Sequence, residues 1–257
     1  MNTNQIKLPS PSFISYLRGC VFTIVVIFAS IILMLLICLD IVICFVFPFI
    51  CKYNLLRRFS SYIAILLPRI VGIKIKLLGI ENIPSSGAIL LSKHMSMMET
   101  CVLATLPNTK TLLRDTLKFI PIWNIAMYYT GCIWIKRSGG VGSLLKMLSQ
   151  VEKVVDDGKK ILIFPEGTRV AYGKKSKMKL GIMQLYPKVT FVPVALNCGV
   201  LFGKRTQSPK FTGVVTIKIM PPIPPNINIK DARELAASLI TTESDRLCAE
   251  CVEKYIK

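Results

Sequence analysis

The stretch AILLSKHMSMMETCVLATL, residues 88–106, joins two kinds of local structure. Its first five residues, 88–92, form a short apolar run, which is typical of a strand that is buried on both faces. The segment 95–106 that follows predicts a helix. Because a buried strand followed directly by a helix is the repeating unit of α/β proteins, this stretch indicates that class of fold.

The same alternation of strands and helices continues along the chain. Further strands are predicted from alternating or short apolar runs at 73–77, 132–136, 161–164, 189–196 and 214–220. Helices are predicted at 144–155, where apolar residues recur at helical spacing up to Asp157-Gly158, and at 231–256. We therefore expect an α/β fold with a mixed, largely parallel sheet flanked by helices.

A hydrophobic segment precedes this domain. Residues 20–39 pass without a charged side chain, and as a helix they are long enough to cross a hydrocarbon core of about 30 Å. A second apolar run, 41–51, follows Asp40 and either extends one tilted helix or returns as a shallow hairpin. We predict a membrane anchor over residues 1–60 and a second domain over residues 61–257.

The chain of 257 residues is both apolar and basic, with a mean hydropathy of +0.54 and a formal net charge of +19. This combination predicts attraction to anionic membrane lipid and to acidic substrates. Nucleic acid is disfavoured as a partner, because the sequence has no Cys/His zinc spacing and no arginine-rich arm. The nine cysteines do not have the spacing of a disulfide framework, which fits a reducing cytoplasmic setting.

The single histidine of the chain, His94, lies between the first quoted strand and its helix, and Glu99 follows it. One interpretation is structural: Ser96 and Glu99 match a capping box, in which Glu99 binds the first amide of the helix. On a regular helix, residues five apart point about 140° away from each other. The His94 and Glu99 side chains can therefore meet only if His94 lies before the helix, at a strand-to-helix turn. In that case Glu99 can orient the imidazole, and His94 can act as a general base.

A second stretch, ILIFPEGTRV at 161–170, runs from a predicted buried strand into a loop. Pro165 ends the strand, Gly167 lets a backbone approach a ligand closely, and Arg169 offers a planar group for phosphate. The structural interpretation of these residues is a turn that leads into a solvated basic loop. The functional interpretation is a site for phosphate or anionic lipid, because five cations without an acid begin at Arg169: Arg169, Lys174, Lys175, Lys177 and Lys179.

In these stretches the chain resembles the 1-acylglycerol-3-phosphate acyltransferase family (lysophosphatidate acyltransferases of the PlsC type). The segment 94–99 is similar to the family's H-x4-D block, GCIWIKR at 131–137 to its second block, and FPEGTR at 164–169 to its third. VPVA at 192–195 resembles the fourth block, and the four blocks occur in the family's order within residues 71–220. The chain departs from the family in one respect, since Glu99 stands where aspartate is usual.

The resemblance implies a PlsC-type acyltransferase domain preceded by a membrane-anchoring helix or helical hairpin. It implies that His94 takes the proton from the 2-hydroxyl of 1-acylglycerol 3-phosphate as that oxygen attacks an acyl thioester, and that Glu99 orients His94. The donor is acyl-CoA or acyl-carrier protein, and no metal or other cofactor is required. The implied location is the bacterial inner membrane, with the catalytic domain on the cytoplasmic side.

The resemblance also implies which residues bind the acceptor. Arg169, with Arg137 as a second candidate, is expected to hold the phosphate of lysophosphatidate. Glu166 is expected to position glycerol oxygens, while Gly167 and Thr168 shape the loop. The implied partners are thus lysophosphatidate, the acyl thioester and anionic membrane lipid.

Three alternatives remain at this point. The enzyme could acylate another lysolipid acceptor, such as lyso-ornithine lipid or glycerol 3-phosphate. It could use Ser96 as a nucleophile, although that role leaves Glu99 without an obvious function. Finally, the chain could be a non-catalytic membrane-binding protein that retains the fold, although such a protein needs no general base.

Overall fold

The structure is a computed structural model, which describes residues 10–46, 68–119, 132–136, 140–174, 176–205 and 208–256. Within these ranges the strands form one sheet in the order β1-β7-β6-β2-β5-β3-β4. The bounds are Ile73–Leu78 for β1, Ala88–Ser92 for β2, Thr109–Arg114 for β3, Ile133–Ile135 for β4, Lys160–Ile163 for β5, Phe191–Leu196 for β6 and Gly213–Ile219 for β7. The pair β6 and β7 is antiparallel and the other pairs are parallel, so the predicted mixed, largely parallel sheet is confirmed.

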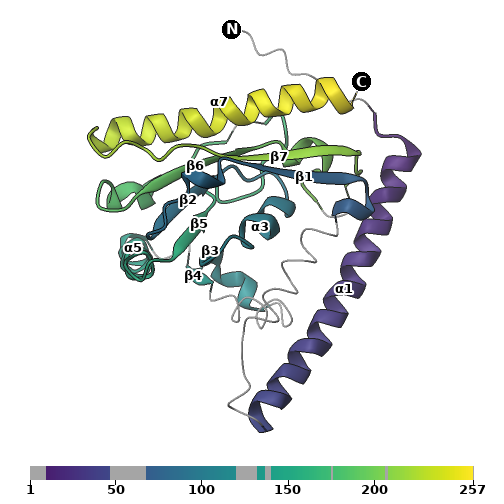
Figure 1. Ribbon diagram of the computed structural model, residues 1–257, viewed down its shortest axis with the longest axis horizontal. Coiled ribbons are helices and arrows are strands. Elements are labelled where there is room, and N and C mark those ends of the chain that lie inside the picture. The colour runs from purple at the N-terminus through teal and green to yellow at the C-terminus, as the bar shows by residue number, and fades with distance from the viewer. Residues whose placement is uncertain are drawn as a thin grey trace.

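Helices pack against this sheet. The α-helices are α1 (Phe13–Val46), α3 (Met98–Leu103), α5 (Gly140–Asp156), α6 (Cys198–Leu201) and α7 (Ile229–Tyr255). Short 3-10 helices are η1 (Ile80–Asn82), η2 (Asp115–Phe119) and η3 (Gly181–Leu185). In Figure 1 the strands lie between α7 and α3, as expected for an α/β protein.

Alternate residues of β2 point into two separate hydrophobic cores. Leu90 belongs to a core that includes residues of α3, α6 and α1, whereas Ile89 and Leu91 belong to a core that includes residues of α5 and α7. All three side chains are fully buried. The apolar run at 88–92 is therefore a central strand covered on both faces, which explains why it is continuously hydrophobic rather than alternating.

The strands and helices expected from the apolar patterns are confirmed. β1, β2, β4, β5, β6 and β7 fall on the six predicted runs, and α5 and α7 fall on the two predicted helical segments. The strand β3, in contrast, was not predicted. Its residues TKTLLR are only partly apolar, but pairing with β5 on one side and β4 on the other satisfies their backbone hydrogen bonds.

The N-terminal segment forms the helix α1, which passes through Asp40 without interruption. The described residues therefore contain no turn between the two apolar runs. Figure 1 shows α1 beside the sheet, with its C-terminal part extending away from it. Within the described ranges, no helix has both the length and the apolar character that crossing a membrane requires, so the predicted transmembrane helix is not supported. The predicted domain boundary at residues 60 and 61 lies outside the described residues.

The stretches 88–106 and 161–170 meet at one edge of the sheet. β2 pairs in parallel with β5 and with β6, so the carboxyl ends of these strands lie side by side. His94 follows β2, and the loop that begins at Phe164 follows β5. The carboxyl ends of parallel strands are where α/β proteins place their sites.

Candidate active site

His94 and Glu99 meet at the turn between β2 and α3. Nδ1 of His94 lies 2.9 Å from Oε1 of Glu99. The helix α3 begins only at Met98, so His94 lies before the helix, as the geometric argument required. An ionised carboxylate can only accept hydrogen bonds, and Nδ1 is therefore the protonated nitrogen of the neutral ring. This arrangement leaves Nε2 as the basic nitrogen.

The Glu99 carboxylate is fully buried and is held by several donors. Its Oε1 also accepts hydrogen bonds from the backbone N–H groups of Met95 and Ser96, each at 2.7 Å, and its Oε2 accepts one from the Ser96 hydroxyl. Glu99 thus binds amides at the start of the helix and the imidazole at the same time. The bond from the Ser96 N–H is one that a capping box predicts, although the N-cap residue of α3 is Met97. The geometry is compatible with both interpretations of the S-x-x-E pattern, because one carboxylate contacts the amides and the imidazole.

Neither Ser96 nor a neighbouring thiol is placed to act as a nucleophile. Ser96 is fully buried, and its hydroxyl donates to Glu99 and accepts from the N–H of Met98 at 3.0 Å. Burial, reinforced by the charge of Glu99, raises the pKa of the Cys101 thiol to about 11 and raises the pKa of Cys198 well above its usual value. These thiols stay protonated near neutral pH, so they are poor nucleophiles.

The loop after β5 holds His94 from the other side. The His94 ring stacks on the Phe164 ring, with 4.1 Å between the ring centres. The backbone carbonyl of His94 accepts a hydrogen bond from the N–H of Val170 at 2.8 Å. Gly167 has a φ angle of +67°, a conformation that favours glycine and lets the loop turn back through a hydrogen bond from its N–H to the Phe164 carbonyl.

The structure places the Glu166 carboxylate beside Lys93 and the backbone of His94. Its side chain is fully buried, and it is not among the residues that line the neighbouring cavity. Oε2 of Glu166 instead accepts a hydrogen bond from the backbone N–H of His94 at 2.8 Å, and Oε1 lies 2.8 Å from Nζ of Lys93. The predicted role of Glu166 as a ligand of glycerol oxygens stays a prediction.

The remaining predicted residues have different environments. Arg169 and Thr168 line a cavity beside His94, and Nη1 of Arg169 also donates a hydrogen bond to the Lys204 carbonyl at 3.1 Å. Arg137, the second predicted phosphate ligand, lies outside the described residues.

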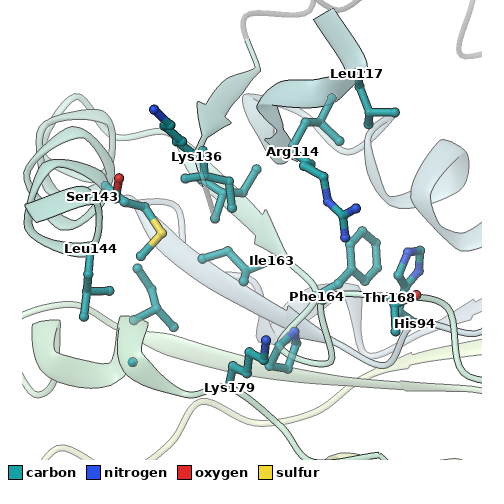
Figure 2. A pocket seen from close by; sticks show the side chains of 18 of the residues that line it. His94, Arg114, Leu117, Lys136, Ser143, Leu144, Ile163, Phe164, Thr168 and Lys179 are labelled. Atoms are coloured by element: carbon teal, nitrogen blue, oxygen red, sulfur yellow. The ribbon is translucent and has the colours of Figure 1, made fainter. Parts of the chain in front are cut away.

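The cavity next to His94 has a volume of about 480 Å³. Figure 2 shows His94, Thr168 and Phe164 together at one end, with Ser143 and Leu144 at the other. Within the described part of the chain, the charged side chains on its wall are all basic: Arg114, Lys136, Arg169 and Lys179. Much of the remaining wall is apolar: Leu112, Leu113, Leu117, Ile135, Leu144, Met147, Ile163 and Ile182. Such a cavity suits a ligand that has both an anionic group and a hydrocarbon chain.

Two of the charged residues at this site were not predicted. Arg114 ends β3, and in Figure 2 its side chain points towards Phe164 and His94. Recognition of TKTLLR as a parallel strand would have identified Arg114, because it would place this residue at the same sheet edge as His94. Lys93 directly precedes His94, but no sequence pattern indicated that Glu166 would be its partner.

The chain has relatives among known proteins. Residues 74–197, which include His94 and the 164–169 loop, match the family model named Acyltransferase. The chain is 31% identical to the 1-acyl-sn-glycerol-3-phosphate acyltransferase of Pseudomonas aeruginosa, over 68% of this chain and 70% of that protein. It is also 31% identical to the enzyme of that name from Chlamydomonas reinhardtii, over 66% of this chain and 54% of the algal protein.

The fold has a counterpart among solved structures. The crystal structure of the 1-acyl-sn-glycerophosphate acyltransferase PlsC from Thermotoga maritima aligns with a TM-score of 0.62 at 20% identity, over 86% of this chain and 98% of that one. The match to the Acyltransferase family model and the named relatives identify the protein as an acyltransferase. They also show that the chain belongs to the 1-acyl-sn-glycerol-3-phosphate acyltransferase family.

Proposed function

We propose that this protein transfers an acyl group from an acyl thioester to the 2-hydroxyl of 1-acyl-sn-glycerol 3-phosphate, forming phosphatidic acid. The observation that carries the proposal is the His94–Glu99 pair, whose histidine lines a cavity with apolar and basic walls. Lysophosphatidate combines the two properties of that cavity, because its phosphate is anionic and its acyl chain is apolar.

In the proposed reaction, Nε2 of His94 takes the proton of the acceptor hydroxyl as its oxygen attacks the thioester carbonyl carbon. The carbon–sulfur bond then breaks, and the proton passes from the imidazolium to the departing thiolate. Glu99 stabilises the imidazolium and fixes the ring orientation through Nδ1. Because a thiolate leaves readily, the proposed step needs neither a covalent enzyme intermediate nor a cofactor.

Arg169 is the proposed ligand of the acceptor phosphate. It lines the same cavity as His94, and it extends from the loop that packs against the histidine ring. A guanidinium forms two parallel hydrogen bonds to a phosphate, which fixes the acceptor's orientation as well as its position. Arg114 lines the cavity at the same end and adds positive charge there.

An assay of the purified protein tests this proposal. Lysophosphatidate, lyso-ornithine lipid, glycerol 3-phosphate and monoacylglycerol are each offered with acyl-CoA and with acyl-carrier protein as donors. We expect lysophosphatidate to be the preferred acceptor, with either or both donors accepted. Equal rates with monoacylglycerol, which lacks the phosphate, would show that the proposed acceptor is wrong.

Attachment to the membrane through α1 is part of the proposal. Apolar side chains along α1 are exposed, including Phe13, Ile24, Phe28, Ile32 and Leu35. These side chains give the helix an apolar surface that is suited to the interfacial region of a bilayer, while the basic domain is attracted to anionic headgroups. In a bacterium the proposed location is the inner membrane with the catalytic domain facing the cytoplasm, where acyl thioesters are available.

A further inference from the structure

Lys93 and Glu166 form an ion pair that is removed from solvent directly behind the catalytic histidine. Nζ of Lys93 lies 2.8 Å from Oε1 of Glu166, and the exposed fractions of the two side chains are 6% and 0%. Two charges are costly to remove from water, and their mutual attraction offsets this cost only in good geometry. A pair of this kind at the carboxyl ends of the central strands β2 and β5 therefore requires an explanation beyond stability.

The second oxygen of Glu166 connects this ion pair to the base. Oε2 accepts the hydrogen bond from the backbone N–H of His94 at 2.8 Å. The His94 carbonyl is bound by the N–H of Val170 at 2.8 Å, and the Lys93 N–H donates to the Val194 carbonyl at 3.1 Å. Both backbone polar groups of His94 are thus bound by the loop after β5, and the Lys93 ammonium lies against the other oxygen of the carboxylate that makes one of these bonds.

We propose that Lys93 and Glu166 are positioning residues for His94: their buried ion pair holds the backbone of the base against the loop that carries Arg169. This inference rests on the proposed function and assigns Glu166 a different role from contact with substrate. The pair links the proton-accepting residue to the proposed phosphate-binding residue, so that the acceptor hydroxyl and Nε2 meet in one geometry. A displacement of about 1 Å in such a site can reduce turnover about a hundredfold.

The test uses a charge-balanced pair of substitutions. Glu166→Gln retains an oxygen for the His94 N–H but leaves the Lys93 charge buried without a partner, and Lys93→Met leaves the Glu166 charge without one. Each single variant is expected to lower kcat about ten- to a hundredfold, with KM for the acceptor changed less than about threefold. The double variant Lys93→Met/Glu166→Gln has no unpaired charge, and it should recover kcat to within about threefold of wild type.

A second ion pair is the matched control. Lys218 and Glu243 are 2.7 Å apart, but their side chains are 39% and 17% exposed and they join β7 to α7 away from His94. Lys218→Met/Glu243→Gln, and each of its single variants, should leave kcat and KM within about twofold of wild type, because neither residue lines the cavity beside His94.

Because His94 is the only histidine, its imidazole can be observed alone by NMR after ¹⁵N-histidine labelling, with an affinity tag that contains no histidine. The wild-type spectrum should show one Nδ1-protonated species. Each single variant should show several species or a weakened Nδ1 hydrogen bond, and the double variant should return to one species. This signal reports the position of the base in any folded variant and does not depend on turnover.

The outcomes separate this inference from the proposed function. The kinetics are measured with whichever lysolipid wild type prefers, so failure of lysophosphatidate as acceptor does not affect the comparison. A rise in acceptor KM with unchanged kcat in Glu166→Gln would mean that Glu166 binds substrate, and would overturn the inference. Unchanged kcat in both single variants, or a folded double variant that stays inactive, would also overturn it.

If the single variants do not fold, the double variant decides. An active double variant supports the inference, and an inactive or unfolded double variant refutes it.

Discussion

Nη1 of Arg169 donates a hydrogen bond to the backbone carbonyl of Lys204, 3.1 Å away. The guanidinium is thus held between the loop after β5 and the segment after α6, at the wall of the cavity that contains His94. A side chain fixed at one nitrogen loses less conformational freedom when it binds a phosphate with the others. This arrangement gives the first prediction.

Arg169→Ala should raise KM for lysophosphatidate about ten- to a hundredfold, which corresponds to the loss of one charge-assisted contact of roughly 1.5–3 kcal/mol. KM for the acyl donor should change far less. Arg169→Lys should recover only part of the loss, because an ammonium cannot form the two parallel bonds of a guanidinium. The measurement is steady-state kinetics with each substrate varied in turn. Equal effects on the two KM values would contradict phosphate binding by Arg169.

His94→Ala should reduce turnover about 10²–10⁴-fold, which is the usual contribution of a positioned general base. Acceptor binding should change little, because the proposed phosphate contact is made by Arg169. The chain has no second histidine that could replace His94. Single-turnover rates and equilibrium binding of lysophosphatidate provide the two measurements. Turnover within threefold of wild type would remove His94 from the mechanism.

Glu99→Gln should lose most activity, because the variant removes the charge that stabilises the imidazolium. Glutamine also has only one acceptor oxygen, whereas Glu99 accepts from His94, Met95 and the Ser96 backbone at Oε1 and from the Ser96 hydroxyl at Oε2. Glu99→Asp keeps the charge and should retain measurable activity. kcat for both variants is compared with their melting temperatures. Wild-type activity in Glu99→Gln would mean that Glu99 serves only as a helix cap.

Lys210 gives a prediction about stability and pH. Its side chain is fully buried, its Nζ lies 4.3 Å from the centre of the Phe202 ring, and burial lowers its pKa from 10.5 to about 8. Between these two values the unfolded chain binds more protons than the folded chain, so this residue makes the free energy of unfolding rise with pH. Below about pH 8 its burial penalty is present in full.

The measurement for Lys210 is the unfolding free energy in detergent between pH 7 and 10.5. The free energy of unfolding of wild type should rise relative to that of Lys210→Met as the pH increases through this range. The substitution removes the titrating group but retains an apolar chain that can pack on Phe202. Parallel pH profiles for the two proteins would show that Lys210 keeps an ordinary pKa in the folded state.

Exposed apolar residues of α1 give a prediction about membranes. Replacement of Phe28, Ile32 and Leu35 by serine should reduce flotation with lipid vesicles, because these side chains are 62%, 50% and 60% exposed and are proposed to enter the bilayer interface. The binding that remains should require anionic lipid and should fall with added salt, since attraction between surface charges is screened within about 8 Å at 0.15 M.

The matched control for α1 replaces exposed apolar residues elsewhere. Ile80 and Ile229 are 49% and 37% exposed and lie in η1 and α7, so their replacement by serine should leave flotation unchanged. Salt-resistant flotation of the α1 variant would show that another hydrophobic surface binds the membrane.

The sequence alone predicted much of the fold and the central pair of the site. Apolar runs such as 88–92 and 161–164 predicted the strands that become β2 and β5, because continuous hydrophobicity requires burial whatever the neighbours are. The geometry of His94 and Glu99 was also predictable, since both residues belong to one local turn and only a break before the helix lets them meet. Local sequence is sufficient to predict a contact when the two interacting groups are only a few residues apart.

Only the tertiary structure decided what surrounds that pair. Glu166 follows His94 by 72 residues, and it contacts the His94 backbone and Lys93 because β2 and β5 pair in parallel, in a register that aligns Leu91 with Ile163. The placement of β3 beside β5 likewise brings Arg114 to the cavity, although its own sequence did not predict a strand. Whether a carboxylate faces a substrate or a buried lysine depends on which strands become neighbours. Strand pairing is set by the packing of the whole core, and no short segment of sequence specifies it.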